Sequence, residues 1–281
     1  MPVTLGASSG GAFPQLTITQ SQTWVPPQDG NVCIHLVGAG GGAFGGSQLT
    51  PRGGGAGAYA KIPTLAVTTS GSYTLVVGVG GVGGGFGDNG ITGGNSTIAG
   101  TGLTGTKTAG GGAGGASSAT ANGGTVSGSG ESWAGFTGGA GKYSGGAVGI
   151  YATGMVGGTT AGYGGQSNPT ELYANMGGTT DAASGGLAMS GYGIICGGNE
   201  KSYAQTWTQS FTPNIQFVAG DLCGGGGVYT TQGYRYIRGA NGGIGGGGGG
   251  AQSATGTAAG NPYSYGGAGG DGIILIQYLP W

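Results

Sequence analysis

Apolar and polar residues alternate in a few short runs near the beginning of the chain and in one run at its end. Residues 31–37, NVCIHLV, place Val32, Ile34 and Leu36 on one face of an extended strand. The opposite face carries Cys33, His35 and Val37. Similar β-branched and aromatic runs are LTITQ (16–20), AYAKI (58–62), SYTLVVGV (72–79) and GIILIQY (272–278). No stretch has a persuasive helical period, so the pattern predicts an all-β protein whose last strand pairs with the early ones.

Glycine dominates the part of the chain between residues 80 and 270. The sequence has 80 Gly in 281 residues, and ordering each Gly costs roughly 0.5–1 kcal/mol more than ordering Ala. The glycine blocks are interrupted by Ala, Ser, Thr, Val, Tyr and Phe, and the chain has few charges, which favours order over disorder. They lack the strict three-residue period of collagen. Cohesion must therefore come from something other than buried side chains.

Extended polyproline-II-type helices of glycine offer that cohesion. Without Cβ atoms, several such helices can lie close together and form hydrogen bonds between their backbones. We therefore expect a small antiparallel β-sandwich and a polyglycine-II-type helical bundle that presents loops; a glycine-rich, multi-turn β-structure is the competing form. The expected divisions are an N-terminal attachment segment (1–19), a discontinuous β-sheet domain (20–83 and 270–281) and the glycine-rich bundle (84–269).

Charge and composition argue against several classes of function. Seven basic and eight acidic residues give a net charge of −1, so we expect no binding to nucleic acid and no insertion into membranes. Residues 1–16 lack the basic start and apolar core of a signal peptide. The three cysteines are too few for a disulfide framework; buried free thiols are favoured, and a pair between Cys196 and Cys223 stays open.

Motifs that would indicate catalysis or a cofactor have no supporting context. GVGGVG (78–83) matches a dinucleotide-binding pattern but is followed by more glycine, and GASSG (6–10) lacks the strand and helix of a nucleophile elbow. His35 is the only histidine, so we expect it to be packed or hydrogen-bonded rather than bound to a metal. The sequence predicts no enzyme, no cofactor and no metal site.

Aromatic residues gather where the glycine blocks are interrupted. The span 131–238 holds 14 of the 24 aromatic residues, among Ser, Thr, Gly and Asn, which is the composition that antibody loops use for contact. Packing against the glycine blocks is the alternative role for these rings. The predicted contact residues are Trp133, Phe136, Tyr173, Tyr203, Trp207, Phe211, Tyr229, Tyr234, Arg235, Tyr236 and Arg238.

Three stretches resemble the glycine-rich domains of bacteriophage tail fibres: SQTWVPPQDGNVCIHLVGAGGG, GGGAGAYAKIPTLAVTTSGSYTLVVGVGGVGGG and GGAGGDGIILIQY. The size of the chain and its aromatic-rich loops are also similar to the distal adhesins of T-even-like phages. That resemblance implies polyglycine helices packed together, with variable loops that bind host surface receptors. Those adhesins carry a longer N-terminal attachment domain, whereas glycine begins here by residue 38.

We therefore expect a virion tail-fibre or tail-tip adhesin, made in the host cytoplasm, that binds a host surface receptor, either a glycan or an outer-membrane protein. Its other expected partners are tail or fibre proteins of the virion. Such fibre proteins are often trimers and the adhesins are monomeric caps, so a homotrimer is favoured and a monomer stays open. The alternative is a purely structural virion protein without receptor contact. An ice-binding protein is a third hypothesis, from the threonines of TGLTGTKTAG (101–110).

Overall fold

The computed structural model describes part of the chain. It comprises residues 15–46, 52–117, 119–128, 134–136, 140–141, 145–148, 154, 188–189, 194–195, 224, 228–230, 236–239, 241–253 and 263–279. These residues form strands and extended segments, with no helix among them. The all-β class is therefore confirmed for the described residues. None of them forms a helix that could cross a lipid bilayer.

The first of two five-stranded sheets joins the beginning of the chain to its end. Its order is β1-β16-β3-β4-β9, and every neighbouring pair is antiparallel. The strands are β1 (Gln15–Ile18), β16 (Ile273–Tyr278), β3 (Gly30–Val37), β4 (Tyr59–Val67) and β9 (Ala134–Phe136). The terminal strand thus does pair with early ones, as the sequence predicted, and it lies between two of them.

The second sheet extends beyond the strands that the sequence predicted. Its order is β2-β5-β6-β7-β8, again antiparallel. The strands are β2 (Gln22–Trp24), β5 (Tyr73–Val76), β6 (Ser96–Gly100), β7 (Lys107–Ala109) and β8 (Val126–Ser127). Strands β6 to β8 were not anticipated, because buried positions in β6 and β7 hold polar residues, Ser96 and Lys107. The threonine-rich span 101–110 forms a turn and β7 rather than a regular threonine array.

The two sheets share one apolar core. Val32, Ile34 and Leu36 of β3 are fully buried in a cluster that also contains Tyr73 and Leu75 of β5. The face of β3 that carries Val32, Ile34 and Leu36 is therefore the one that enters this core. Six further short strands of the described part form three two-stranded pairings. One is antiparallel, β10 (Ala188–Met189) with β11 (Ile194–Ile195), and two are parallel, β12 (Val228–Thr230) with β14 (Ala251–Ser253) and β13 (Tyr236–Arg238) with β15 (Tyr263–Tyr265).

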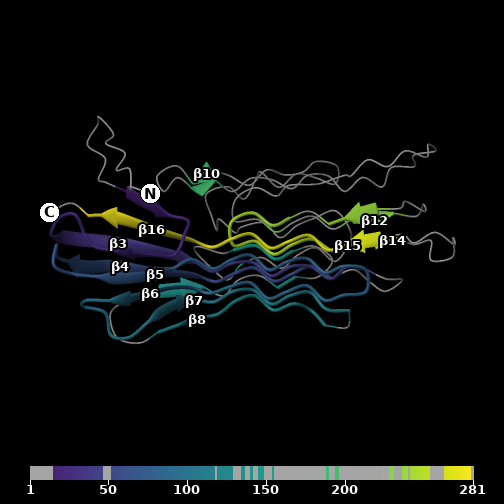
Figure 1. The fold of residues 1–281 in the computed structure, drawn as a ribbon, viewed down its shortest axis with the longest axis horizontal. Helices are drawn as coiled ribbons and strands as arrows, with labels where there is room; N and C mark the ends of the chain where they lie inside the picture. The colour runs from purple at the N-terminus through teal and green to yellow at the C-terminus, as the bar shows by residue number, and fades with distance from the viewer. Residues whose placement is uncertain are drawn as a thin grey trace.

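Extended segments leave the sheets and run together to the opposite end of the molecule (Figure 1). We call them glycine rows; they are residues 38–45, 52–58, 78–87, 88–94, 110–115, 241–250 and 266–272. Row 38–45 continues β3, and row 266–272 leads into β16. The rows are not paired as ordinary strands, because successive residues of one row form hydrogen bonds with different neighbours.

Row 38–45 shows this pattern most completely. The amides of Gly38, Ala39 and Gly40 donate to three different rows, at Ala58, Gly94 and Gly270. The next three amides repeat the order, donating to carbonyls of residues 55, 91 and 267, at distances of 2.8–2.9 Å. Carbonyls of the same row accept hydrogen bonds from three further rows, at Gly112, Gly81 and Gly248. One row therefore has six hydrogen-bonded neighbours, and its donors change neighbour with a period of three residues.

Close approach explains why these positions are glycine. A Cβ added at Gly40, Gly41 or Gly42 would overlap a backbone carbonyl of a neighbouring row, whereas none of the three has a positive φ. In the same row, Ala39, Ala43 and Phe44 are buried at 0–2% exposure, so their side chains point into spaces between rows. Glycine is thus required by the neighbour that a position faces, not by the backbone angle.

Candidate functional site

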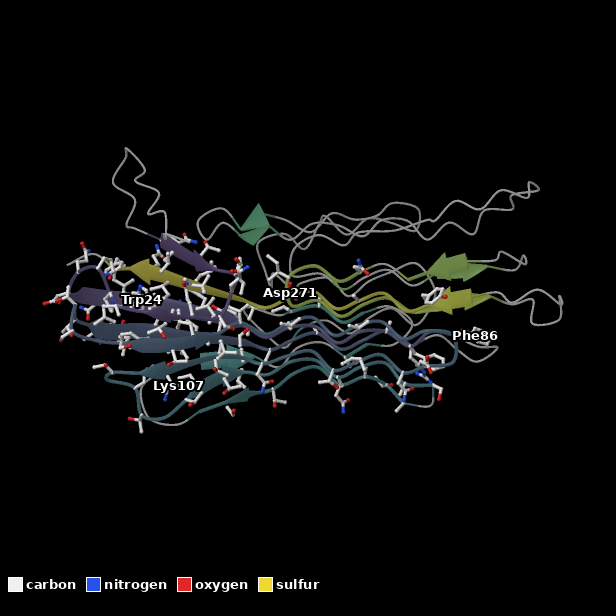
Figure 2. All side chains as sticks on the ribbon, in the orientation of Figure 1. Trp24, Phe86, Lys107 and Asp271 are labelled. Carbon is white, nitrogen blue, oxygen red and sulfur yellow. The ribbon has the colours of Figure 1, made fainter. Side chains whose placement is uncertain are left out.

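The candidate site is the end of the glycine rows remote from the two sheets. Figure 2 places Trp24 and Lys107 at the sheet end, Asp271 where the rows begin and Phe86 at the opposite end. Strands β12 and β14 also lie toward that opposite end (Figure 1). The rows that lead there are fixed by backbone hydrogen bonds along their length, so whatever they carry is held on a rigid support.

Only some of the predicted contact residues fall within described strands. Phe136 lies in β9, the edge strand of the first sheet; Tyr229 lies in β12, and Tyr236 and Arg238 lie in β13. The structure thus brings the backbones of Tyr236 and Arg238 onto one strand, paired with β15. The remaining predicted residues lie outside the described ranges: Trp133, Tyr173, Tyr203, Trp207, Phe211, Tyr234 and Arg235.

Two exposed aromatic residues at the row ends were missed by the sequence analysis. Phe86 is 51% exposed and Tyr265 is 38% exposed. They end neighbouring rows, because the amide of Gly266 donates to the carbonyl of Gly84 at 2.9 Å. Tyr265 is also the register partner of Arg238. The signal was present in the sequence, since each ring directly adjoins a glycine block, in GGGFGD and YSYGG.

Gly87 gives the turn beside Phe86 its shape. Its φ of 81° lies in the left-handed region that favours glycine. The amide of Gly87 donates to the carbonyl of Gly45, and the amide of Asp88 donates to Gly85. Two rows are thus joined by a tight turn, and Phe86 projects from it while both flanking rows stay within the hydrogen-bonded array.

A second cluster of polar side chains lies on the outer face of the first sheet. Cys33, His35 and Tyr59 are 5–6% exposed. The Tyr59 hydroxyl lies 2.7 Å from Nδ1 of His35, and Cys33 Sγ lies 3.4 Å from Nε2. The sequence prediction that His35 is packed and hydrogen-bonded is confirmed, and so is the prediction of a buried free thiol at Cys33. Cys196 and Cys223 lie outside the described ranges.

Burial sets the protonation states of this cluster. It lowers the pKa of His35 to about 4, and the positive charge of Lys61 acts in the same direction. Burial also raises the pKa of the Cys33 thiol, which Lys61 opposes. The pair is therefore a neutral imidazole beside a neutral thiol near pH 7. An activated cysteine requires a thiolate, and burial of Cys33 disfavours that form.

The remaining motifs keep structural roles where the structure describes them. Residues 78–83, which match the dinucleotide pattern, belong to a glycine row. Residues 95–97, NST, match the acceptor pattern for N-glycosylation. Oδ1 of Asn95 accepts a hydrogen bond from the amide of Gly111 at 2.9 Å. Within the described ranges, no three His, Cys, Asp or Glu side chains gather as a metal site would require.

Comparison with protein families identifies the chain over nearly its whole length. A family model described as a glycine-rich domain (Gly_rich_2) matches residues 17–279. The match includes every glycine row and both sheets apart from Gln15 and Leu16 of β1. A search of curated proteins finds no match to the chain.

Proposed function

Because the chain belongs to the glycine-rich domain family, we propose that it is a virion tail-fibre or tail-tip adhesin that binds a host-cell surface receptor. The observation that carries the proposal is the three-residue rotation of hydrogen bonds around row 38–45. Such an array holds its far end rigidly without a large apolar core, and the far end carries exposed aromatic rings. A rigid support with exposed aromatic rings at its end suits an adhesin.

The rows are proposed to form a polyglycine-II-type bundle. A polyproline-II helix has three residues per turn and no internal hydrogen bonds, so each of its amides must find a partner on a neighbour. The period of three in row 38–45 and its six neighbours support this geometry. The glycine-rich, multi-turn β-structure considered from the sequence would instead pair each edge of a segment with one neighbour along its length.

Contact with the receptor is assigned to the row end and the loops near it. Exposed Phe86 and Tyr265 offer flat apolar surfaces that can stack on sugar rings or on side chains of a protein loop. The aromatic residues predicted from the sequence, with Arg235 and Arg238, remain candidates for further contacts. Several copies on one virion raise the avidity of individually weak contacts, so a modest affinity per chain is sufficient.

The proposal is tested with the purified full chain, labelled with a fluorophore, on a panel of bacterial strains. We expect it to bind the strains that its phage infects and to block their infection, and deletion of residues 200–217 to abolish both effects. Phe86→Ala and Tyr265→Ala together are expected to weaken cell binding at least tenfold. Val25→Ala is the matched control, because Val25 is 54% exposed yet belongs to the sheet end.

Two outcomes would contradict the adhesin. One is equal cell binding by the wild-type chain and the deletion variant, with both folded by circular dichroism. The other is no cell binding at all, together with stoichiometric incorporation into virions away from the tail tip. The second outcome would favour the purely structural virion protein. Immuno-electron microscopy of virions locates the chain and separates the two functions.

A further inference from the structure

Apolar side chains form a ridge along the side of the row array, away from its end. Val79 is 73% exposed, Val82 is 66% exposed and Ile91 is 58% exposed. Val82 and Ile91 lie on neighbouring rows, because the amide of Ile91 donates to the carbonyl of Val82 at 2.9 Å. We call these three residues the valine ridge. They account for three of the seven large apolar side chains that are exposed in the described part.

Several outward-facing amides of the array, including that of Gly80 next to Val79, are capped by side chains. The amide of Gly80 donates to Asp271 Oδ1 at 2.7 Å, and that of Gly111 donates to Asn95 Oδ1 at 2.9 Å. The amide of Ala268 donates in the same way to Asn241 Oδ1 at 3.0 Å. These contacts show how an outer row satisfies backbone groups that have no neighbouring row to meet them.

The valine ridge has no such caps. Among the described residues, the amides of Val79 and Val82 have no hydrogen-bond partner, and the carbonyls of Gly80 and Gly83 accept none. Donors and acceptors therefore alternate along the same open side of row 78–87. They repeat every three residues, about 9 Å apart at the rise of a polyproline-II helix. The ridge is apolar, and the backbone beside it also offers free hydrogen-bond donors and acceptors.

The surface around the ridge carries few charges. Asp88 is the only charged residue between positions 74 and 99, and the whole chain has a net charge of −1. Asp271, which caps Gly80, is a second carboxylate near the ridge. An acidic partner would therefore find no cation here, whereas two copies of this chain, each with a net charge of −1, would repel each other very little.

We propose that the valine ridge is the contact surface between two copies of this chain, related by a two-fold axis. An isologous contact needs a self-complementary surface, and this one carries both donors and acceptors at the same spacing. In an antiparallel arrangement, Val82 of one copy fits between Val79 and Val82 of the other, over the flanking glycines. Backbone groups of each row then face those of its partner. The proposal is independent of receptor binding.

The test is the mass of the full chain in solution, measured by sedimentation velocity between about 1 and 100 μM. We expect a reversible dimer, and we expect Val79→Asp with Val82→Asp to raise its dissociation constant at least tenfold. Both side chains are exposed, so the variant should keep the fold, which circular dichroism and the melting temperature check. Val25→Asp is the matched control and should leave the dimer unchanged.

A cross-linking experiment detects the same contact between two copies directly, without a variant that disrupts the dimer. Val82→Cys should give a disulfide-linked dimer on mild oxidation, whereas Val25→Cys and the wild-type chain should not. A monomeric wild-type chain at 100 μM would overturn the proposal, and so would a dimer that the double Asp variant leaves intact. A mass of three chains would overturn the two-fold arrangement. Ridge-dependent binding of a monomer to neutral phosphatidylcholine vesicles would assign the ridge to a lipid surface instead.

Discussion

Replacing Gly42 by Ala tests whether close packing of rows, rather than backbone freedom, fixes the glycines. Gly42 lies in the central row, and its added Cβ would overlap the carbonyl of Val82 and lie 2.7 Å from the nitrogen of Gly83. Both atoms belong to the backbone of a row that is itself hydrogen-bonded to its neighbours. No side-chain rotation can therefore relieve the overlap, and the two rows must move apart.

The size of the effect follows from the bonds that such a movement breaks. Gly42 donates to Ile91 at 2.8 Å and accepts from Gly115 at 2.8 Å, and the next residue, Ala43, donates to Gly267 at 2.9 Å. Losing two or three such bonds at about 1 kcal/mol each, with about 1–3 kcal/mol for overpacking, gives a loss of about 3–6 kcal/mol. Domains have only about 5–15 kcal/mol of total stability, so the variant should be close to unfolding.

Gly85→Ala is the control for this substitution. It lies in a neighbouring row, has no positive φ, and its added Cβ would meet only the end of the Asp88 side chain, at 3.1 Å. We expect chemical denaturation to show a large loss of stability for Gly42→Ala and a change within about 0.5 kcal/mol for Gly85→Ala. Equal losses in the two variants would refute the argument, because both replace a row glycine by the same residue.

Three further predictions concern single contacts. The free energy of unfolding should be highest above about pH 6.5 and fall by up to about 3 kcal/mol as the pH drops toward 4. In this range His35 binds a proton in the unfolded chain but stays neutral when buried in the folded chain. His35→Gln should flatten this pH dependence, measured by urea titrations. Hydrogen exchange should protect the amide of Gly42, which is hydrogen-bonded, far more than that of Val82; equal rates in the monomeric chain would contradict the row structure. Asn95→Ala should remove the cap on Gly111 and lower the free energy of unfolding by about 1 kcal/mol, whereas Asn95→Asp should retain it.

The sheets could be predicted from the sequence where apolar residues alternate with polar ones. The β3 pattern is clear because Val32, Ile34 and Leu36 all enter one core. Strand β7 escaped notice because Lys107 occupies an inward position, where its ammonium group donates to the carbonyl of Thr104 at 3.2 Å. A prediction based on the polarity of residues assigns a lysine to the surface, even where its side chain is buried. Strand prediction therefore failed where a polar side chain found its partner inside.

The sequence predicted closely packed glycine segments but not which segments are neighbours. Glycine content indicates that backbones approach each other closely, but it does not say which row lies beside which. Row 38–45 requires glycine at position 42 and accepts alanine at position 43, and only the positions of its neighbours explain the difference. Exposed Phe86 and Tyr265 were missed for a related reason, since a single ring beside a glycine block gives no periodic signal.

The three-residue rotation also restricts how such a chain can change its length. One residue added within row 38–45 would turn every following amide by about 120° toward the wrong neighbour, whereas three added residues would restore the direction of each. Insertions and deletions of residues inside a row should therefore be tolerated only in multiples of three. Turns at the row ends escape this restriction, so evolution can resize them freely while the array beneath stays in register.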